Sequence, residues 1–360
     1  MSESATRKPH TVTKKEWWLL IGGVVLFVSA LGCELVKAPA VVTFGVSAAA
    51  LGIMASLVGE ATDHLGDRFS PSATGVIQSA LGNLPELFFA IFALRAGLDT
   101  VVAAALVGSV LGNALLVLGA AFVVGGLRHK TQKFPDAGPN QLAILLLLGV
   151  AVLAVPSLTS NLHLPVANHE HELSLVASVV LLVLYVITLL AARDGDLSEE
   201  PRGRGEASWP LGRVLAVLIA ASVGAAFVSD WFVSALTPAL HVLHMSEAFA
   251  GFVVVAIAGN AVENVVGIQM AAQNKASTAV SVIVQSPLQI IYVLFPAVVL
   301  LSTIFHLGAF TLVLSPQLLI VLALATVLVA VVVIDGESTW PEGAALMALY
   351  VVIATTFWWG

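Results

Sequence analysis

The feature that most limits the fold of this chain is a series of eleven apolar segments, each about as long as a membrane-spanning helix. Hydrophobic residues make up 59% of the 360 residues and charged residues only 10%, whereas about 25% is usual in soluble domains. In lipid the backbone must satisfy its own hydrogen bonds, so we expect an all-α polytopic membrane protein. The expected spans are 17–36, 39–60, 72–95, 100–126, 140–158, 171–192, 209–230, 246–272, 276–303, 309–334 and 341–359.

The positions of lysine and arginine predict how these spans are oriented. With residues 1–16 in the cytoplasm, 13 of the 15 basic residues fall on the inner side, and only Lys37 and Arg95 fall outside. This asymmetry follows the positive-inside rule and puts the C-terminus outside. Segment 17–36 is too long for a signal-peptide core and lacks a clear cleavage site, so we expect a retained span. The one cysteine, Cys33, excludes an internal disulfide.

Two segments of the chain resemble each other. SALGNLPELFFAIFAL (79–94) and AIAGNAVENVVGIQMA (256–271) align without a gap at an offset of 177 residues. The topology runs these two segments in opposite directions, which predicts two inverted five-helix repeats, a pattern typical of secondary transporters. We expect repeats at 39–192 and 209–360, an extra helix at 17–36, and a mixed-charge linker at 193–208. The offset pairs Gly82 with Gly259, Asn83 with Asn260, Glu86 with Glu263, and Ser109 with Ser286.

The paired carboxylates Glu86 and Glu263 indicate a cation site inside the membrane. One membrane glutamate can be satisfied in a helix contact, but two at symmetric positions, each with its own Gly-Asn, favour a shared site. Asn83 lies three residues before Glu86 and shares its helix face, and Pro85 is expected to free a carbonyl oxygen. These hard oxygen ligands suit calcium. Burial favours the protonated carboxyl and a divalent ion favours the carboxylate, so competition between them predicts exchange.

Other polar residues lie near these motifs in the sequence. Each is open to two interpretations, as part of the site or as an ordinary helix contact or helix end. Those on the helices after the motifs are Ser109, Asn113, Ser286 and Gln289, and Gln78 is in the first motif helix. Glu60 and Asp63 end the second span on its inner side, where they could line the inner mouth of an access path. The cluster from His169 to Glu172 has no further spaced ligands, so a solvated helix start is favoured over a zinc site.

The G-N-x-x-E-L and G-N-A-x-E motifs, with their matching next helices, resemble the calcium/proton exchanger (CAX) family of the calcium/cation antiporter superfamily. The segments LVGEATDHLGDRF, GGLRHKTQKF and DGESTWPEG are similar to family loops. The resemblance implies eleven spans, mobile gating helices, a calcium site between Glu86 and Glu263, and roles for Asn113 and Gln289. Asp230, with Ser229, stands where the family has Ser-Glu, and so could lie on the access path.

The chain departs from the family pattern near the site. Pro85 replaces the usual Ala or Thr, Asn264 replaces the histidine after the second glutamate, and Gln285-Ser-Pro-Leu-Gln289 replaces Gly-Ser-Ser-Thr-Gln. The predicted function is antiport of Ca²⁺ for H⁺ by alternating access, with Ca²⁺ as substrate and without a cofactor, a nucleic-acid partner or enzymatic activity. The predicted location is a bacterial inner membrane. The alternatives are a Na⁺/Ca²⁺ exchanger, an exchanger of Mn²⁺ or Mg²⁺, an intramembrane enzyme that uses the acid pair, and a passive channel.

Overall fold

The fold is taken from a computed structural model, which describes residues 13–66, 68–69, 74, 77–134, 137–194, 209–308 and 310–359. The side chains of 15, 137, 192–194 and 261–264 lie outside the description. The expected tail 1–16 and linker 193–208 therefore fall largely outside it. So does the side chain of Glu263, although its backbone is described.

The described residues are mostly helical, as expected. Nine helices among them are long and apolar enough to cross a membrane. The α-helices are α1 (Lys14–Leu35), α2 (Ala40–Gly66), α4 (Leu84–Arg95), α5 (Asp99–Leu111), α6 (Leu118–His129), α7 (Ala137–Asn161), α8 (Glu170–Asp194), α9 (Leu211–Leu243), α10 (Glu247–Phe249), α11 (Ala256–Gly259), α12 (Ala261–Ala272), α13 (Ala276–Gln289), α14 (Phe295–Ile304), α15 (Pro316–Ile334) and α16 (Trp340–Trp358).

The two expected spans that are absent from these nine are the ones that carry the motifs, 72–95 and 246–272. The π-helical turn η1 (Gln78–Gly82) precedes α4, and the backbone leaves the helical region at Asn83 (φ −93°, ψ 14°). In the second motif, η4 (Ala250–Val255) and α11 precede a similar break at Asn260 (φ −102°, ψ 19°). Irregular backbone is tolerated at membrane depth only where it is buried in protein or lines a cavity, so these breaks mark a candidate site.

The helices recur along the chain at the offset of the motifs. Adding 177 to α4 (84–95) gives 261–272, the bounds of α12, and adding it to α5 (99–111) gives 276–288, one residue short of α13. The π-helical turns η2 (Gly112–Val117) and η5 (Ile290–Leu294) correspond in the same way. The similarity between the motifs therefore extends to the elements that follow them.

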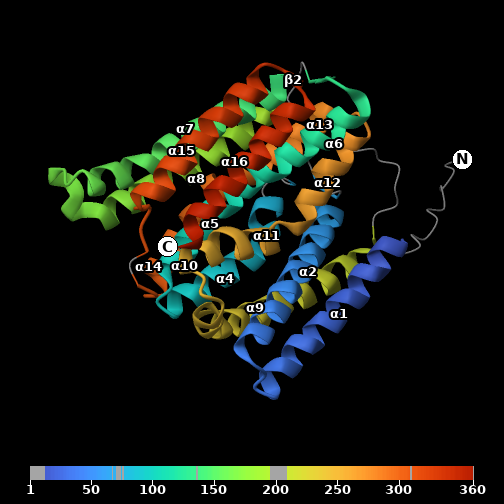
Figure 1. The fold of residues 1–360 in the computed structure, drawn as a ribbon, viewed down its shortest axis with the longest axis vertical. Helices are drawn as coiled ribbons and strands as arrows, with labels where there is room; N and C mark the ends of the chain where they lie inside the picture. The colour runs from blue at the N-terminus through green and yellow to red at the C-terminus, as the bar shows by residue number, and fades with distance from the viewer. Residues whose placement is uncertain are drawn as a thin grey trace, which may run out of the picture.

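The helices form two groups (Figure 1). The long helices α1, α2 and α9 lie side by side, and α2 packs against α9 more extensively than any other described pair of elements. The C-terminal half of α2 and the N-terminal half of α9 enclose a separate apolar cluster, with Met54, Leu57 and Val58 of α2 against Leu218 and Ala221 of α9. The rest of the molecule shares one large core.

Two rings join the first turns of α2 and the C-terminal half of α9 to that large core. Phe44 of α2 stacks on Phe232 of α9 with ring centroids 4.9 Å apart, and Phe89 of α4 meets Phe232 edge-on at 5.9 Å. The opposite halves of α2 and α9 enclose their own cluster, onto which Leu81 and Phe88 also pack.

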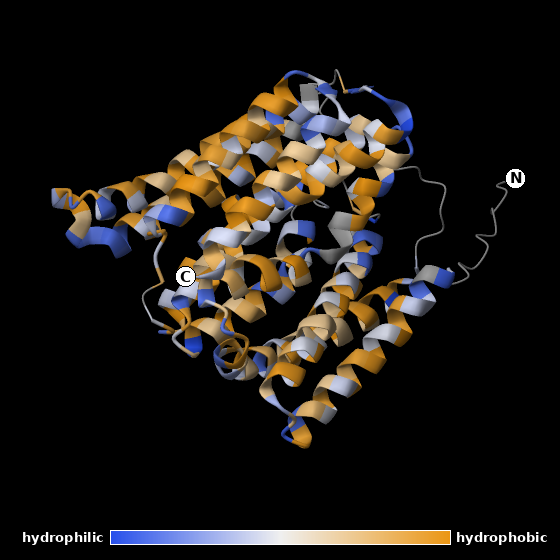
Figure 2. Ribbon diagram, viewed as in Figure 1, coloured by the Kyte–Doolittle hydropathy of each residue, from blue (hydrophilic) through white to orange (hydrophobic). Residues whose placement is uncertain are grey.

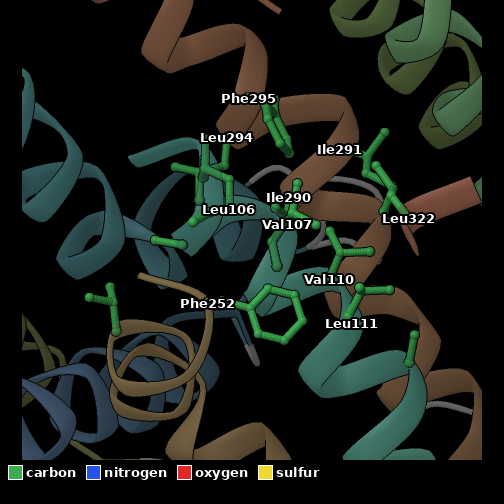
Figure 3. Packing of buried hydrophobic residues seen from close by; sticks show 14 of the residues in the cluster. Leu106, Val107, Val110, Leu111, Phe252, Ile290, Ile291, Leu294, Phe295 and Leu322 are labelled. Atoms are coloured by element: carbon green, nitrogen blue, oxygen red, sulfur yellow. The ribbon is translucent and has the colours of Figure 1, made fainter. Parts of the chain in front are cut away.

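At the centre of the large core, α5 crosses η4 with almost no space between the backbones. A β-carbon at Gly108 would lie 2.2 Å from the carbonyl oxygen of Phe252, and one at Gly251 would lie 2.3 Å from that of Val101. Figure 3 shows the Phe252 ring beside Val110 and Leu111, with the side chains of η5 around them. Small residues allow this approach, as in other helix contacts within membranes.

The loops before α7 and before α16 contain a short two-stranded pair, which adds two strands of two residues each to the expected helices. Strand β1 (Gln132–Lys133) runs antiparallel to β2 (Glu337–Ser338), and Phe134 N–H donates to the Gly336 carbonyl at 2.8 Å. Glu337 accepts a hydrogen bond from Lys133, which raises the pKa of this lysine. Two residues per strand give no sequence period, so the pattern could not predict them. Figure 2 shows polar residues at these loops and apolar residues along the helices.

Candidate functional site

Glu86 lies in the first turn of α4, directly after the break at Asn83. Its side chain is 9% exposed. Pro85 is also in this first turn, where the amide donors have no partner within the helix, so its missing N–H costs no helical hydrogen bond. Pro85 therefore starts α4 and does not interrupt it, which corrects its expected role. The positive end of the helix dipole points at Glu86 and favours a carboxylate there.

Glu263 has the same backbone position in the second motif. It is the third residue of α12, as Glu86 is the third residue of α4, and the break at Asn260 precedes it. Each motif thus offers a carboxylate residue at the start of a half-helix inside the membrane. Transporter sites near the bilayer midplane are commonly built from such half-helix ends.

Glu86 reaches across to the other motif. A β-carbon at Gly259 would lie 2.6 Å from Oε1 of Glu86 and 3.0 Å from its Cγ. Only a residue without a side chain lets the carboxylate lie against the backbone this closely. The predicted pairing of the two Gly-Asn motifs is therefore a contact in space, since a residue of one motif packs on the glycine of the other.

The two motif asparagines are each held by a polar side chain from the opposite half. Asn83 Nδ2 donates to Gln289 Oε1 at 3.5 Å. Asn113 Nδ2 lies 3.1 Å from Asn260 Oδ1 and 3.1 Å from Ser286 Oγ, and Ser286 also bonds Asn260, at 3.3 Å. All five side chains are buried. The amides of the two halves thus meet in one place, and the sequence could not show which ones pair.

Two small hollows lie on either side of Ser109. One is lined by Glu86, Phe89, Ala90, Val102, Ala105, Leu106, Ser109 and Val255, and the other by Ser109, Gly112, Asn113, Leu116, Val117, Ala256, Ile257 and Asn260. Asn113 is 1% exposed, and its Oδ1 has no hydrogen-bond partner among the described residues. A buried oxygen in that position is suited to a cation, because buried polar atoms otherwise find a partner.

Gln78, predicted as a supporting polar residue, and the residues predicted on an access path do not join this buried group. Gln78 Nε2 donates to Asp63 Oδ1 at 2.8 Å, at the C-terminal end of α2. Glu60 lies near the same end, 3.9 Å from His64 Nε2. Asp230 is exposed on α9, where its carbonyl accepts from Ser234, whereas Ser229 beside it is buried. Gln78 is therefore a partner of Asp63 and not a part of the motif cluster.

The His169–Glu172 cluster begins a helix, as the sequence favoured. The turn η3 (Pro165–His169) leads into α8, and His169 faces Glu172 at 4.0 Å with both side chains 69% exposed.

The model of the sodium/calcium exchanger protein family matches residues 39–192 and 213–359. The chain belongs to this family. The two matched stretches correspond closely to the two repeats expected from the motifs. This exchanger is thus a multi-pass membrane protein of a transporter family.

Several known proteins are similar to this exchanger over most of their length. The Ca²⁺/H⁺ antiporter ChaA of Bacillus subtilis is 34% identical over 355 residues, which cover 94% of this chain and 97% of the relative. The Ca²⁺/H⁺ antiporter of Synechocystis is 31% identical over 326 residues, with 84% and 87% covered. A solved structure of native YfkE matches with a TM-score of 0.82 at 31% identity, over 94% of this chain and 99% of that one.

One polar contact of the exchanger was not predicted from the sequence. Ser79 hydrogen-bonds Tyr185 of α8, and both residues are buried. A serine one turn before the motif and a tyrosine in an apolar span carry no spacing signal that links them.

Proposed function

We propose that this exchanger carries Ca²⁺ out in return for H⁺, with Glu86 and Glu263 as the shared binding groups. Asn83 and Asn260 supply amide oxygens, and Asn113, Ser286 and Gln289 hold those amides in register. The observation that carries the proposal is the contact of Glu86 with Gly259, because it joins the two motifs into one site. The names of the relatives, Ca²⁺/H⁺ antiporters at 34% and 31% identity, support calcium and protons as substrates.

The exchange follows from competition at the carboxylates. A buried carboxylate is costly when ionised and unpaired, so the empty site takes up protons. A divalent cation holds both carboxylates ionised and displaces those protons. If the empty, unprotonated site cannot change sides, each turnover must carry either the cation or protons. The helix ends at Glu86 and Glu263 favour negative charge, which lets the site release its protons when calcium arrives.

The two-group packing supports alternating access. The group of α1, α2 and α9 has its own apolar cluster in its inner half, and it joins the large core through aromatic rings at its outer end. We propose that α2 and α9 change their position against the core while the motif helices stay in place. The repeats 39–192 and 209–360 have opposite directions in this scheme.

We further propose a bacterial inner membrane as the location, with the N-terminus in the cytoplasm. The 13-to-2 distribution of basic residues supports this orientation. Calcium enters the site from the cytoplasm in this orientation. The inward proton gradient then drives its export.

A sodium-coupled exchanger is the second candidate, because the family includes that activity in its name. The helices after the motifs supply neutral Asn113 and Gln289 to the site and no additional carboxylate, so the proton-coupled reaction is favoured.

The test uses purified protein in liposomes under an imposed pH gradient or sodium gradient, with Ca²⁺, Mn²⁺ and Mg²⁺ as cations. We expect Ca²⁺ flux driven by the pH gradient, and its loss by at least about 100-fold in Glu86→Gln, since a carboxylate is replaced by a group that neither titrates nor carries charge. Glu247→Gln, at the surface helix α10, is the control. Flux that persists in Glu86→Gln, or that needs sodium, contradicts the proposal.

A further inference from the structure

A second polar cluster lies at the inner ends of α1 and α2, away from the motifs. His64 Nε2 is 3.7 Å from Glu16 Oε1 of α1 and 3.9 Å from Glu60 Oε1 of α2. One carboxylate oxygen from each glutamate and one ring nitrogen of His64 all lie within 4.8 Å of one another. Glu16 is only 5% exposed, although it is next to the membrane surface. A buried carboxylate in that position needs compensation.

The same histidine also contacts the segment that leads into α9. Its ring stacks on Trp209 with centroids 4.6 Å apart and an interplanar angle of 24°. Arg68 donates to the Trp209 carbonyl, and the Arg213 guanidinium lies 6.0 Å from the centre of the Trp209 ring. His64 thus touches α1, α2 and the residue before α9 at one point.

The charge on His64 decides whether these contacts attract. The charged groups around it are Glu16 from α1, Glu60 and Asp63 from α2, and Arg68 and Arg213, which both contact Trp209. Asp63 accepts a hydrogen bond from Gln78. With a proton on the imidazole, the ring forms two ion pairs and a cation–aromatic contact. Without it, two carboxylates remain close together and repel each other.

Helix α1 is the one element in the three-helix group that has no counterpart in the repeats. It packs closely on α2, where a β-carbon at Gly22 or Gly23 would lie 2.7 Å from Ile53 or Leu57, and its other side faces outward. While α1 is held against α2 and α9, it must move with them, and its lipid-facing surface must then move through the bilayer. An ion-paired contact at the inner end therefore opposes movement of α2 and α9 against the core.

We propose that His64 is a cytoplasmic pH sensor: when protonated it bridges Glu16 and Glu60, ties α1 to the inner ends of α2 and α9, and slows exchange. When His64 is neutral, the tie is weakened and exchange is fast. Histidine is the side chain whose charge ordinarily changes between about pH 5 and 8. The sensor slows proton entry when the cytoplasm is already acidic. Its effect on transport rests on the proposed exchange of calcium for protons.

The first arm of the test measures distance and needs no transport. Spin labels at the exposed positions Lys14 and Leu211, in a Cys33→Ser background, report the separation of α1 from the start of α9. We expect a narrow distribution at about pH 6 and a broad one at about pH 8. The His64→Gln variant should give a broad distance distribution at both pH values, and the His64→Lys variant a narrow one at both. Glu16→Gln keeps the capping box with Thr13 because glutamine also caps, and it should behave like His64→Gln.

The second arm measures calcium uptake into everted vesicles, with the pH at the cytoplasmic face varied and the gradient held constant. At about pH 6, His64→Gln should be about fivefold faster than the unaltered protein, the change expected from one partly exposed ion pair. At about pH 8 the His64→Gln variant and the unaltered protein should take up calcium at the same rate, whereas uptake by His64→Lys should be about fivefold slower. His241→Gln, at the outer end of α9, is the control and should change neither value.

Three outcomes overturn the sensor. One is a distance distribution that does not respond to pH, and another is a transport profile in His64→Gln that matches the unaltered protein. The third is a pH response that disappears when a chelator removes trace metals, since a bound metal and not a proton would then bridge the cluster. Absent calcium flux in every variant contradicts the proposed function instead, and the distance arm still tests the sensor.

Discussion

Gly259 sets the position of the Glu86 carboxylate, and this contact can be tested with a single methyl group. In Gly259→Ala the new β-carbon would meet Oε1 of Glu86 at 2.6 Å, so the carboxylate must shift. A displacement of about 1 Å in a positioned group can cost about 100-fold in rate, and we expect a loss of that order in calcium flux. Gly32→Ala, on α1 with open space around it, is the matched control. A Gly259→Ala protein with full flux would show that Glu86 does not need this contact.

The polar shell of the site could be predicted as a set of residues but not as a set of pairs. The motifs and their offset identified Asn83, Asn260, Asn113, Ser286 and Gln289. Which amide meets which depends on how α5 and α13 cross the motif breaks, and those crossings are set by packing at glycines and not by sequence spacing. The side chain of Glu263 lies outside the described residues, so its pairing with Glu86 remains a prediction.

At the scale of elements, the crossing of α5 over η4 is a point where the fold depends on two glycines. Gly108→Ala would put a β-carbon 2.2 Å from the Phe252 carbonyl, which is backbone and cannot turn away. We expect a destabilisation of about 1–3 kcal/mol, as for other overpacked positions. Thermal unfolding in detergent measures it, with Gly45→Ala on α2 as the control because nothing lies near that β-carbon. An equal melting temperature in both variants would exclude a tight crossing.

Apolar length predicted nine of the expected helices, because a run of about 20 apolar residues leaves the backbone no alternative in lipid. Length gave no information about the breaks at Asn83 and Asn260, where the chain stays apolar while its backbone leaves the helix. It also missed that α9 extends to Leu243 although we expected its end at 230. Helix ends were predicted least well, since a polar residue near a membrane surface fits equally inside or outside a span.

At the scale of the whole molecule, the separate apolar clusters predict which parts move together. Gly52 of α2 lies against Ala258 of α11, across the boundary between the three-helix group and the core; a β-carbon there would be 3.2 Å from the Ala258 carbonyl. A β-carbon at Gly224 of α9 would lie 2.9 Å from the sulfur of Met54 of α2, within the group. The first contact joins the three-helix group to the core, and the second joins two helices of the same group.

A disulfide at each contact, in a Cys33→Ser background, therefore distinguishes movement between the groups from movement within one. We expect the oxidised Gly52→Cys/Ala258→Cys protein to lose calcium flux and to regain it on reduction, because the bond fixes α2 against the motif region. The oxidised Met54→Cys/Gly224→Cys protein should keep most of its flux, since α2 and α9 then move as they did before. Loss of flux in the second pair would mean that α2 and α9 slide past each other during transport. The molecule would then divide at the α2–α9 interface and not where the apolar clusters separate.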